Sequence, residues 1–164
     1  MHTAVLEREQ FIPAPVEAVF APFADAANLQ AITPPWLHFR IVSSLPITMQ
    51  TGARIVYWLR LHGVPVRWRT RIVAWNPPHD FVDVQTSGPF ALWCHRHTFE
   101  AVPGGTIARD RVEYRIGFGP IGKLVHRLFV QRDLDRIFAY RQEAILDLLE
   151  TSPASGPDAA PSGQ

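Results

Sequence analysis

The most constraining feature of this sequence is one long helical pattern that follows a series of short β-strand patterns. The helix is predicted over residues 123–150, a span of roughly 28 residues or about 40 Å at 1.5 Å per residue. Its buried stripe consists of Leu124, Leu128, Leu134, Ile137, Phe138, Arg141, Ile145 and Leu148. Because the strands are joined by short turns and the long helix comes last, the apolar face of an antiparallel sheet must fold over that helix.

The segments before this helix predict the rest of an α+β fold. A first strand over residues 4–12 ends at Pro13, and two short helices follow, the second capped by Asp25. Further strands are expected over residues 36–43, 54–62, 66–75, 81–86, 90–101 and 106–116. The predicted architecture is therefore a helix-grip fold, in which a curved antiparallel sheet of about seven strands wraps around the C-terminal helix.

The strand predicted over residues 90–101 carries the residues of greatest functional interest. Alternation along it places Trp93, His95, His97 and Phe99 on one face, and Cys94 with its alternate neighbours on the other. Two imidazoles within an aromatic wall indicate a pocket that contains a polar site. The preceding strand is ambiguous, because its apolar residues do not fall in a single phase and its inward face cannot be assigned.

The two histidines allow four interpretations. A metal site requires three or four ligands, Asp110 is the only obvious third, and Cys94 points away, so the pattern favours no metal. A second interpretation makes His95 or His97 a general acid/base whose tautomer is set by Asp110. In the third, the histidines orient an apolar ligand together with Tyr57, Thr70 and Tyr114. In the fourth, they belong to a closed hydrogen-bond network in the core.

Arg141 is the one charged residue on the predicted buried stripe of the helix. A buried arginine requires an anionic partner, and Asp110 is the candidate in the sequence. The pair would then be a salt bridge that holds the helix on the sheet. Alternatively, Arg141 is a cation that binds a carboxylate, phosphate or enolate of a ligand.

Composition excludes several classes of protein. The 164 residues contain 16 Lys+Arg and 15 Asp+Glu, so the net charge is only +1, which argues against a nucleic-acid partner. Arg67, Arg69 and Arg71 alternate along one strand and are interpreted as its solvated face, opposite acidic residues on a neighbouring strand. The single cysteine fits a reducing compartment, and neither a signal peptide nor a membrane-spanning stretch is present, so a cytoplasmic protein without membrane insertion is expected.

Other sites are not supported by sequence patterns. Residues 117–122 are rich in glycine but lack the phosphate-loop and dinucleotide-binding patterns, so no cofactor is predicted. A single domain is expected over residues 1–150, followed by a disordered tail over 151–164 that is rich in proline, serine, alanine and glycine. The sequence does not determine the oligomeric state.

Several segments resemble the START-like superfamily, also called Bet v 1-like or SRPBCC. They are Phe11-Ile12-Pro13-Ala14-Pro15-Val16, Val19-Phe20, Asn28-Leu29, Ile32-Thr33-Pro34-Pro35-Trp36, Trp75-Asn76-Pro77-Pro78, Gly88-Pro89-Phe90, Trp93-x-His95-x-His97-x-Phe99, Asp110-x-Val112-x-Tyr114 and Ile137-Phe138-Ala139-Tyr140-Arg141. The likeness extends over residues 4–150 and is strongest to the bacterial cyclase/dehydrase or coenzyme-Q-binding-protein-like branch. It implies a hydrophobic cavity between the sheet and the long helix, but transfers no catalytic residue to this chain.

The expected function is the binding of a small or medium hydrophobic molecule, such as a lipid, an isoprenoid quinone or a polyketide-like aromatic compound. The predicted ligand-binding residues are Tyr57, Trp68, Thr70, Trp93, His95, His97, Phe99, Tyr114, Phe138 and Arg141. One alternative is a polyketide-type cyclase or dehydratase that uses His95 and His97 with Asp110. A second alternative is a structural or interaction module whose core is filled by side chains.

Overall fold

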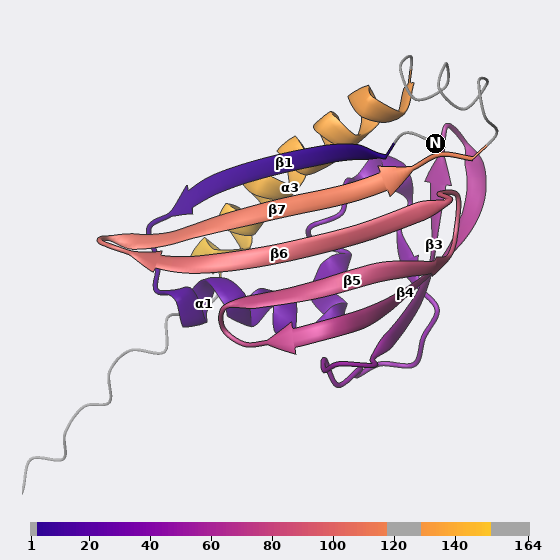
Figure 1. The fold of residues 1–164 in the computed structure, drawn as a ribbon. Helices are drawn as coiled ribbons and strands as arrows, with labels where there is room; N and C mark the ends of the chain where they lie inside the picture. Colours follow the sequence, from indigo (N-terminus) through magenta and orange to yellow (C-terminus); the bar gives the residue numbers. More distant parts are fainter. Residues whose placement is uncertain (1–2, 118–128, 152–164) are drawn as a thin grey trace, which may run out of the picture.

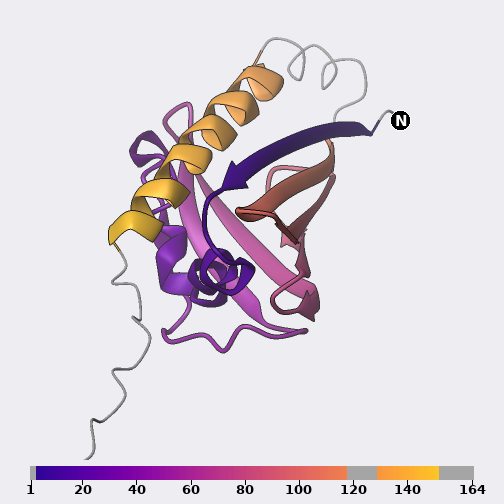
Figure 2. The same cartoon turned by 90° about the vertical axis from the view of Figure 1, so that its left-hand side faces the viewer.

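A computed structural model describes residues 3–117 and 129–151, which form one curved sheet with a long helix across its concave side (Figures 1 and 2). The strands are β1 (Ala4–Ile12), β2 (Arg40–Ile41), β3 (Arg54–Leu61), β4 (Val64–Asn76), β5 (Asp80–Ser87), β6 (Leu92–Val102) and β7 (Gly105–Arg115). The helices are α1 (Val16–Phe20), the 3₁₀ segments η1 (Ala21–Ala24), η2 (Ala26–Leu29) and η3 (Pro35–Leu37), and α3 (Gln131–Thr151). The predicted α+β helix-grip architecture is confirmed.

All neighbouring strands of the sheet are antiparallel, in the order β1-β7-β6-β5-β4-β3-β2. The last strand, β7, therefore returns to pair with the first, and β2 to β7 follow one another as a meander. Tight turns set the register of the hairpins. In the β3–β4 turn, His62 and Gly63 both have positive φ angles, 50° and 82°, which suits the twist of the two flanking strands.

The predicted strand over residues 36–43 is largely wrong. Pro35 begins the 3₁₀ segment η3, His38 adopts a left-handed conformation with φ of 45°, and only β2 pairs with β3. The alternation of apolar residues suggested a strand, but proline at the start of η3 and the left-handed residue after it interrupt the extended backbone.

The helix predictions agree with the structure where it can be compared. Asp25 accepts a hydrogen bond from the backbone N–H of Ala27 at 2.9 Å, as expected of a helix cap, although η2 is a short 3₁₀ segment. Helix α3 ends at Thr151, one residue beyond the predicted end. The predicted start of this helix at Lys123 and the predicted disordered tail lie outside the described residues.

Aromatic packing closes one end of the space between sheet and helix. Phe20 of α1 lies 5.2 Å from Trp75 and 5.4 Å from Phe99, measured between ring centroids, and Phe23 lies 5.0 Å from Phe99. At the other end, Tyr114 of β7 packs in a cluster with α3 residues. Between these two clusters the concave side of the sheet is not filled by side chains.

The arginines on the outer face of β4 do not have the neighbours expected from the sequence. Arg67, Arg69 and Arg71 are exposed, in agreement with the sequence interpretation. Their cross-strand partners on β3 are Trp58, Val56 and Arg54, and on β5 Arg69 and Arg71 pair with Ser87 and Val84, so the expectation of acidic neighbours is wrong. The registers of β4 with its two neighbouring strands decide this, and they are not apparent from the alternation of any one strand. No helix in the described part of the chain is both long and apolar enough to cross a membrane.

Candidate functional site

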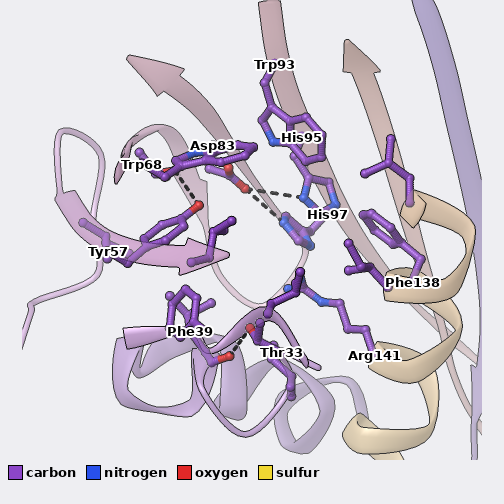
Figure 3. Close-up of a pocket in the computed structure, with 18 of the residues that line it drawn as sticks. Thr33, Phe39, Tyr57, Trp68, Asp83, Trp93, His95, His97, Phe138 and Arg141 are labelled. Carbon is purple, nitrogen blue, oxygen red and sulfur yellow. Dashed lines mark hydrogen bonds and ion pairs between the residues drawn. The ribbon is translucent and has the colours of Figure 1, made fainter. Parts of the chain in front are cut away.

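A cavity of about 660 Å³ lies between the concave face of the sheet and α3 (Figure 3). Its walls are mostly aliphatic and aromatic, with side chains from the sheet, from α3 and from the segments between β1 and β2. Of the residues predicted to bind a ligand, eight line it: Tyr57, Trp68, Thr70, Trp93, His95, His97, Phe138 and Arg141. The two-residue period of β3, β4 and β6 therefore identified most of the polar and aromatic wall.

Phe99 and Tyr114 do not line this cavity, contrary to prediction. Phe99 shares the inward face of β6 with the histidines, but the ring packs against Phe20 and Phe23 of the N-terminal helical segment. Tyr114 is buried among residues that include Leu134 and has ring contacts with neighbouring aromatics. Both side chains point inward, and tertiary contacts rather than strand alternation determine whether an inward residue meets the cavity or the closed core.

The centre of the site is a buried cluster of two histidines and two aspartates. Strand register places Asp83 of β5 opposite His95, and Asp110 of β7 opposite His97. One oxygen of Asp110 lies 2.8 Å from Nε2 of His95 and 2.9 Å from Nδ1 of His97. On the other side of the rings, one oxygen of Asp83 lies 3.2 Å from Nε2 of His97 and 3.7 Å from Nδ1 of His95.

This cluster has fewer N–H groups than contacts between ring nitrogens and carboxylate oxygens. Two neutral imidazoles carry two N–H groups, whereas four contacts join their nitrogens to carboxylate oxygens. Unless a further proton or a cation is present, two of these contacts bring a nitrogen lone pair towards a carboxylate. Hydrogen-bond geometry joins Nε2 of His95 to Asp110 and Nε2 of His97 to Asp83, which leaves Nδ1 of His95 facing Asp83 and Nδ1 of His97 facing Asp110.

Burial and the charges of the cluster act in opposite directions on its ionisation. Burial by itself would raise the pKa of Asp110, but hydrogen bonds from His95 and His97 and attraction to both rings hold that pKa well below its usual value. The pKa of Asp83 is likewise lowered, with burial opposing the hydrogen bond from His97 and the attraction of Arg141. Burial, followed by repulsion from His97, lowers the pKa of His95. Two carboxylates therefore remain ionised beside an imidazole that favours its neutral form.

Asp83 is the residue of the site that sequence reasoning missed. Its strand has buried residues in both phases, since Phe81 and Val82 are each 5% exposed, and the alternation rule therefore assigns no inward face. Asp83 shares its phase with Phe81, whose ring stacks on His97 with centroids 4.0 Å apart. The signal that identifies Asp83 is the pairing of β5 with β6.

Arg141 enters the cavity from α3 and lies below His97 in the view of Figure 3. No ion pair joins it to Asp110 within the residues that the structure describes, so the predicted salt bridge is wrong. Its Nε is buried without a hydrogen-bond partner, and its guanidinium carbon lies 5.8 Å from the ring centroid of Phe23. Arg141 lines the cavity, whereas Asp110 does not.

Trp68 provides a second unsatisfied donor in the same wall. Its Nε1 is buried without a hydrogen-bond partner, and its ring stacks on Tyr57 with centroids 6.0 Å apart. The hydroxyl of Tyr57 has only a long contact of 3.5 Å to the hydroxyl of Thr70. Buried polar groups are almost always hydrogen-bonded in native proteins, so this side of the cavity can accept a ligand oxygen.

A family described as "Polyketide cyclase / dehydrase and lipid transport" has a sequence profile that matches residues 3–150. The chain belongs to this family. The predicted membership of the START-like superfamily is thereby confirmed, and with it a role in hydrophobic ligand binding or cyclisation. No curated protein sequence matches the chain.

Solved structures support the fold of this polyketide cyclase/dehydrase family member. The Zhui aromatase/cyclase from Streptomyces sp. R1128 is 17% identical with a TM-score of 0.75, and the match covers 94% of this chain and 99% of that one. Ara h 8.0201 is 17% identical with a TM-score of 0.67, covering 92% and 100%. The di-domain ARO/CYC BexL from the BE-7585A biosynthetic pathway is 23% identical with a TM-score of 0.69, covering 92% of this chain and 51% of that one.

Proposed function

We propose that this protein binds a hydrophobic molecule that carries at least one oxygen acceptor, such as a lipid, an isoprenoid quinone or a polyketide-like aromatic compound. The observation that carries the proposal is an apolar cavity whose wall contains two buried donors without partners, Nε1 of Trp68 and Nε of Arg141. A ligand carbonyl, hydroxyl or carboxylate would satisfy these donors, while its apolar part would fill the aromatic and aliphatic walls.

The size of the cavity supports the same conclusion. Its volume of about 660 Å³ falls within the range of about 300–1,000 Å³ that is typical of small-molecule sites. A core filled by side chains, the second alternative from the sequence, would leave only small voids, because protein interiors are packed as densely as organic crystals. A hydrophobic cavity of this size therefore favours a binding module over a purely structural one.

The rim of the cavity, where the β3–β4 turn faces the start of α3, provides a route to the cavity. Among its lining residues, His62 of the β3–β4 turn and Phe129 before α3 are exposed, with Phe129 50% exposed. His62 Nε2 lies 2.6 Å from an oxygen of Asp133 at the start of α3, so this contact joins the two sides of the rim. Separation of the β3–β4 turn from α3 would admit a ligand without disturbing the rest of the sheet.

A cavity-blocking variant tests the proposal. Leu59 lines the cavity on β3, and Leu59→Trp would fill space that a ligand needs. Val73→Trp on the outer face of β4, where Val73 is 41% exposed, introduces the same side chain away from the cavity. Native mass spectrometry of freshly purified protein should show a co-purified hydrophobic molecule in the wild type and the Val73 variant, but not in the Leu59 variant.

The proposal would be rejected by an apo mass in all three proteins together with no binding of an apolar fluorescent probe to the wild type.

The alternative, a polyketide-type cyclase or dehydratase, draws support from the family description and from the aromatase/cyclase structures. His97→Gln distinguishes the two. A carrier should lose only modest affinity, whereas an enzyme that uses His97 for proton transfer should lose about 100-fold or more in rate.

A further inference from the structure

We propose that Asp83, His95 and His97 form a binding site for one divalent transition-metal cation, open towards the cavity. In the described part of the chain, ligand atoms from these three residues lie within 4.8 Å of one another. The proposal does not depend on a hydrophobic ligand, since the three side chains are in place without one. It also revises the expectation from the sequence, which favoured no metal because Asp110 was the only apparent third ligand.

The distances on the Asp83 side suit coordination. Tetrahedral zinc with bonds of about 2.0–2.2 Å to nitrogen and oxygen separates neighbouring ligand atoms by about 3.3–3.5 Å. The observed separations from the Asp83 oxygen are 3.2 Å to Nε2 of His97 and 3.7 Å to Nδ1 of His95. The third separation, between the ligand nitrogens of His95 and His97, is at most 4.8 Å, so a cation can bind all three atoms once the two rings turn towards each other.

Asp110 has a different part in the same arrangement. Its contacts of 2.8 and 2.9 Å to the other nitrogen of each ring are hydrogen-bond distances, shorter than the ligand separations expected around a metal. By accepting the Nε2–H of His95, Asp110 turns the Nδ1 lone pair of that ring towards Asp83. Metal-binding histidines very often donate their second N–H to a carboxylate in this way.

A cation would resolve the electrostatic conflict in the cluster. With the Nε2–H of His95 donated to Asp110, the Nδ1 lone pair of His95 faces the Asp83 carboxylate, and a cation that replaces the Nε2 proton of His97 would bind all three ligand atoms. The rings are also held in place, since Phe81 stacks on His97 at 4.0 Å and Phe138 lies edge-on to His95 at 5.4 Å, measured between ring centroids. The site is thus preorganised, and binding requires little loss of side-chain freedom.

The ligand set indicates the class of cation and the accessible position. Two imidazoles and one carboxylate suit zinc or ferrous iron rather than calcium or magnesium, which prefer oxygen ligands. Three protein ligands leave at least one coordination position open. Asp83, His95 and His97 line the cavity whereas Asp110 does not, so an open position would face a ligand oxygen in the cavity. The cation of Arg141 lies on the same side and should weaken metal binding.

The experiment uses the full-length, untagged protein, stripped with a chelator and titrated with Co²⁺ and Zn²⁺. We expect one equivalent to bind, with the visible absorption of tetrahedral or five-coordinate Co²⁺ that Zn²⁺ then displaces. Asp83→Asn should abolish this absorption, and Asp110→Asn should weaken affinity by about 10–100-fold. Asp80→Asn is the matched control, because Asp80 lies on the same strand but pairs with the exposed Arg96.

A second measurement uses only the wild-type protein and so does not depend on the folding of a variant. In the wild-type protein, Zn²⁺ should shift the ring ¹⁵N resonances of His95 Nδ1 and His97 Nε2. Shifts confined to exposed His38, His62 or His79, or no saturable binding at one equivalent, would overturn the proposal. Binding of an apolar probe in the presence of chelator tests the proposed function separately, so either proposal can fail while the other stands.

Discussion

Replacing Arg141 with methionine tests whether this side chain serves the cavity or the fold. Arg141 lies on the face of α3 that meets the cavity, and its Nε is buried without a partner. Methionine has an unbranched side chain that can occupy the same path along the helix without the charge. If the role of Arg141 is to bind a ligand, the methionine variant should be at least as stable as the wild type and should bind anionic ligands more weakly.

The size of the effect follows from the contacts of Arg141. A buried donor without a partner costs about 1–3 kcal/mol, and the contact with the ring of Phe23 at 5.8 Å returns about 0.5–1 kcal/mol. The free energy of unfolding should therefore stay level or rise by up to about 2 kcal/mol, because the donor cost exceeds the ring contact. For a chain of 164 residues, this corresponds to a rise in Tm of at most about 8 °C.

Thermal unfolding and two dyes provide the assay. Loss of a charge-assisted hydrogen bond should weaken binding of an anionic apolar dye by about 10–150-fold, while a neutral apolar dye should bind unchanged. Arg132→Met, at an exposed position of the same helix, is the matched control. A fall in Tm of about 6–20 °C is equivalent to the 3–5 kcal/mol lost when a buried ion pair is broken. Such a fall would refute this reasoning and would show that Arg141 forms a salt bridge that stabilises the fold.

Three further predictions concern the fold around the cavity. Phe20→Ala should lower the free energy of unfolding by about 3–5 kcal/mol in urea titrations, because this ring joins α1 to the sheet; a loss below about 1 kcal/mol would contradict that packing. Gly105→Ala should destabilise the pairing of β1 with β7, since an added Cβ would lie 2.3 Å from the carbonyl oxygen of Ile12; an unchanged Tm would refute it. Burial raises the pKa of Tyr57 above its ordinary value of 10.0, so the folded state keeps a proton that the unfolded state loses, and stability should fall as the pH rises above about 10. Tyr57→Phe should make that fall shallower, and an equal pH dependence in the two proteins would count against it.

Local patterns in the sequence predicted much of the site because they reflect the geometry of a single strand or helix. The two-residue period of β6 placed His95 and His97 on one inward face, and the structure has their ring centroids 3.7 Å apart. The helical period likewise placed Phe138 and Arg141 on the face of α3 that meets the cavity. These inferences need no knowledge of what lies across from each element.

Other features depended on interactions that no local pattern contains. The strand predicted over residues 36–43 was interrupted by η3 and by the left-handed His38, and Phe99 was covered by α1 rather than exposed to the cavity. The predicted partnership of Arg141 with Asp110 failed because Asp110 contacts His95 and His97 and does not line the cavity that Arg141 enters. The errors on Phe99 and Arg141 both concern which surface an inward side chain meets.

By itself, the sequence determined the order of the elements, the inward face of most strands and the presence of two imidazoles among aromatic residues. Only the tertiary structure decided that Asp83 and Asp110 lie on opposite sides of those imidazoles. The reason is physical: side-chain alternation follows from the covalent geometry of one strand, whereas cross-strand neighbours depend on the register set by turns and by packing of distant segments. That register places three potential metal ligands at the wall of the cavity.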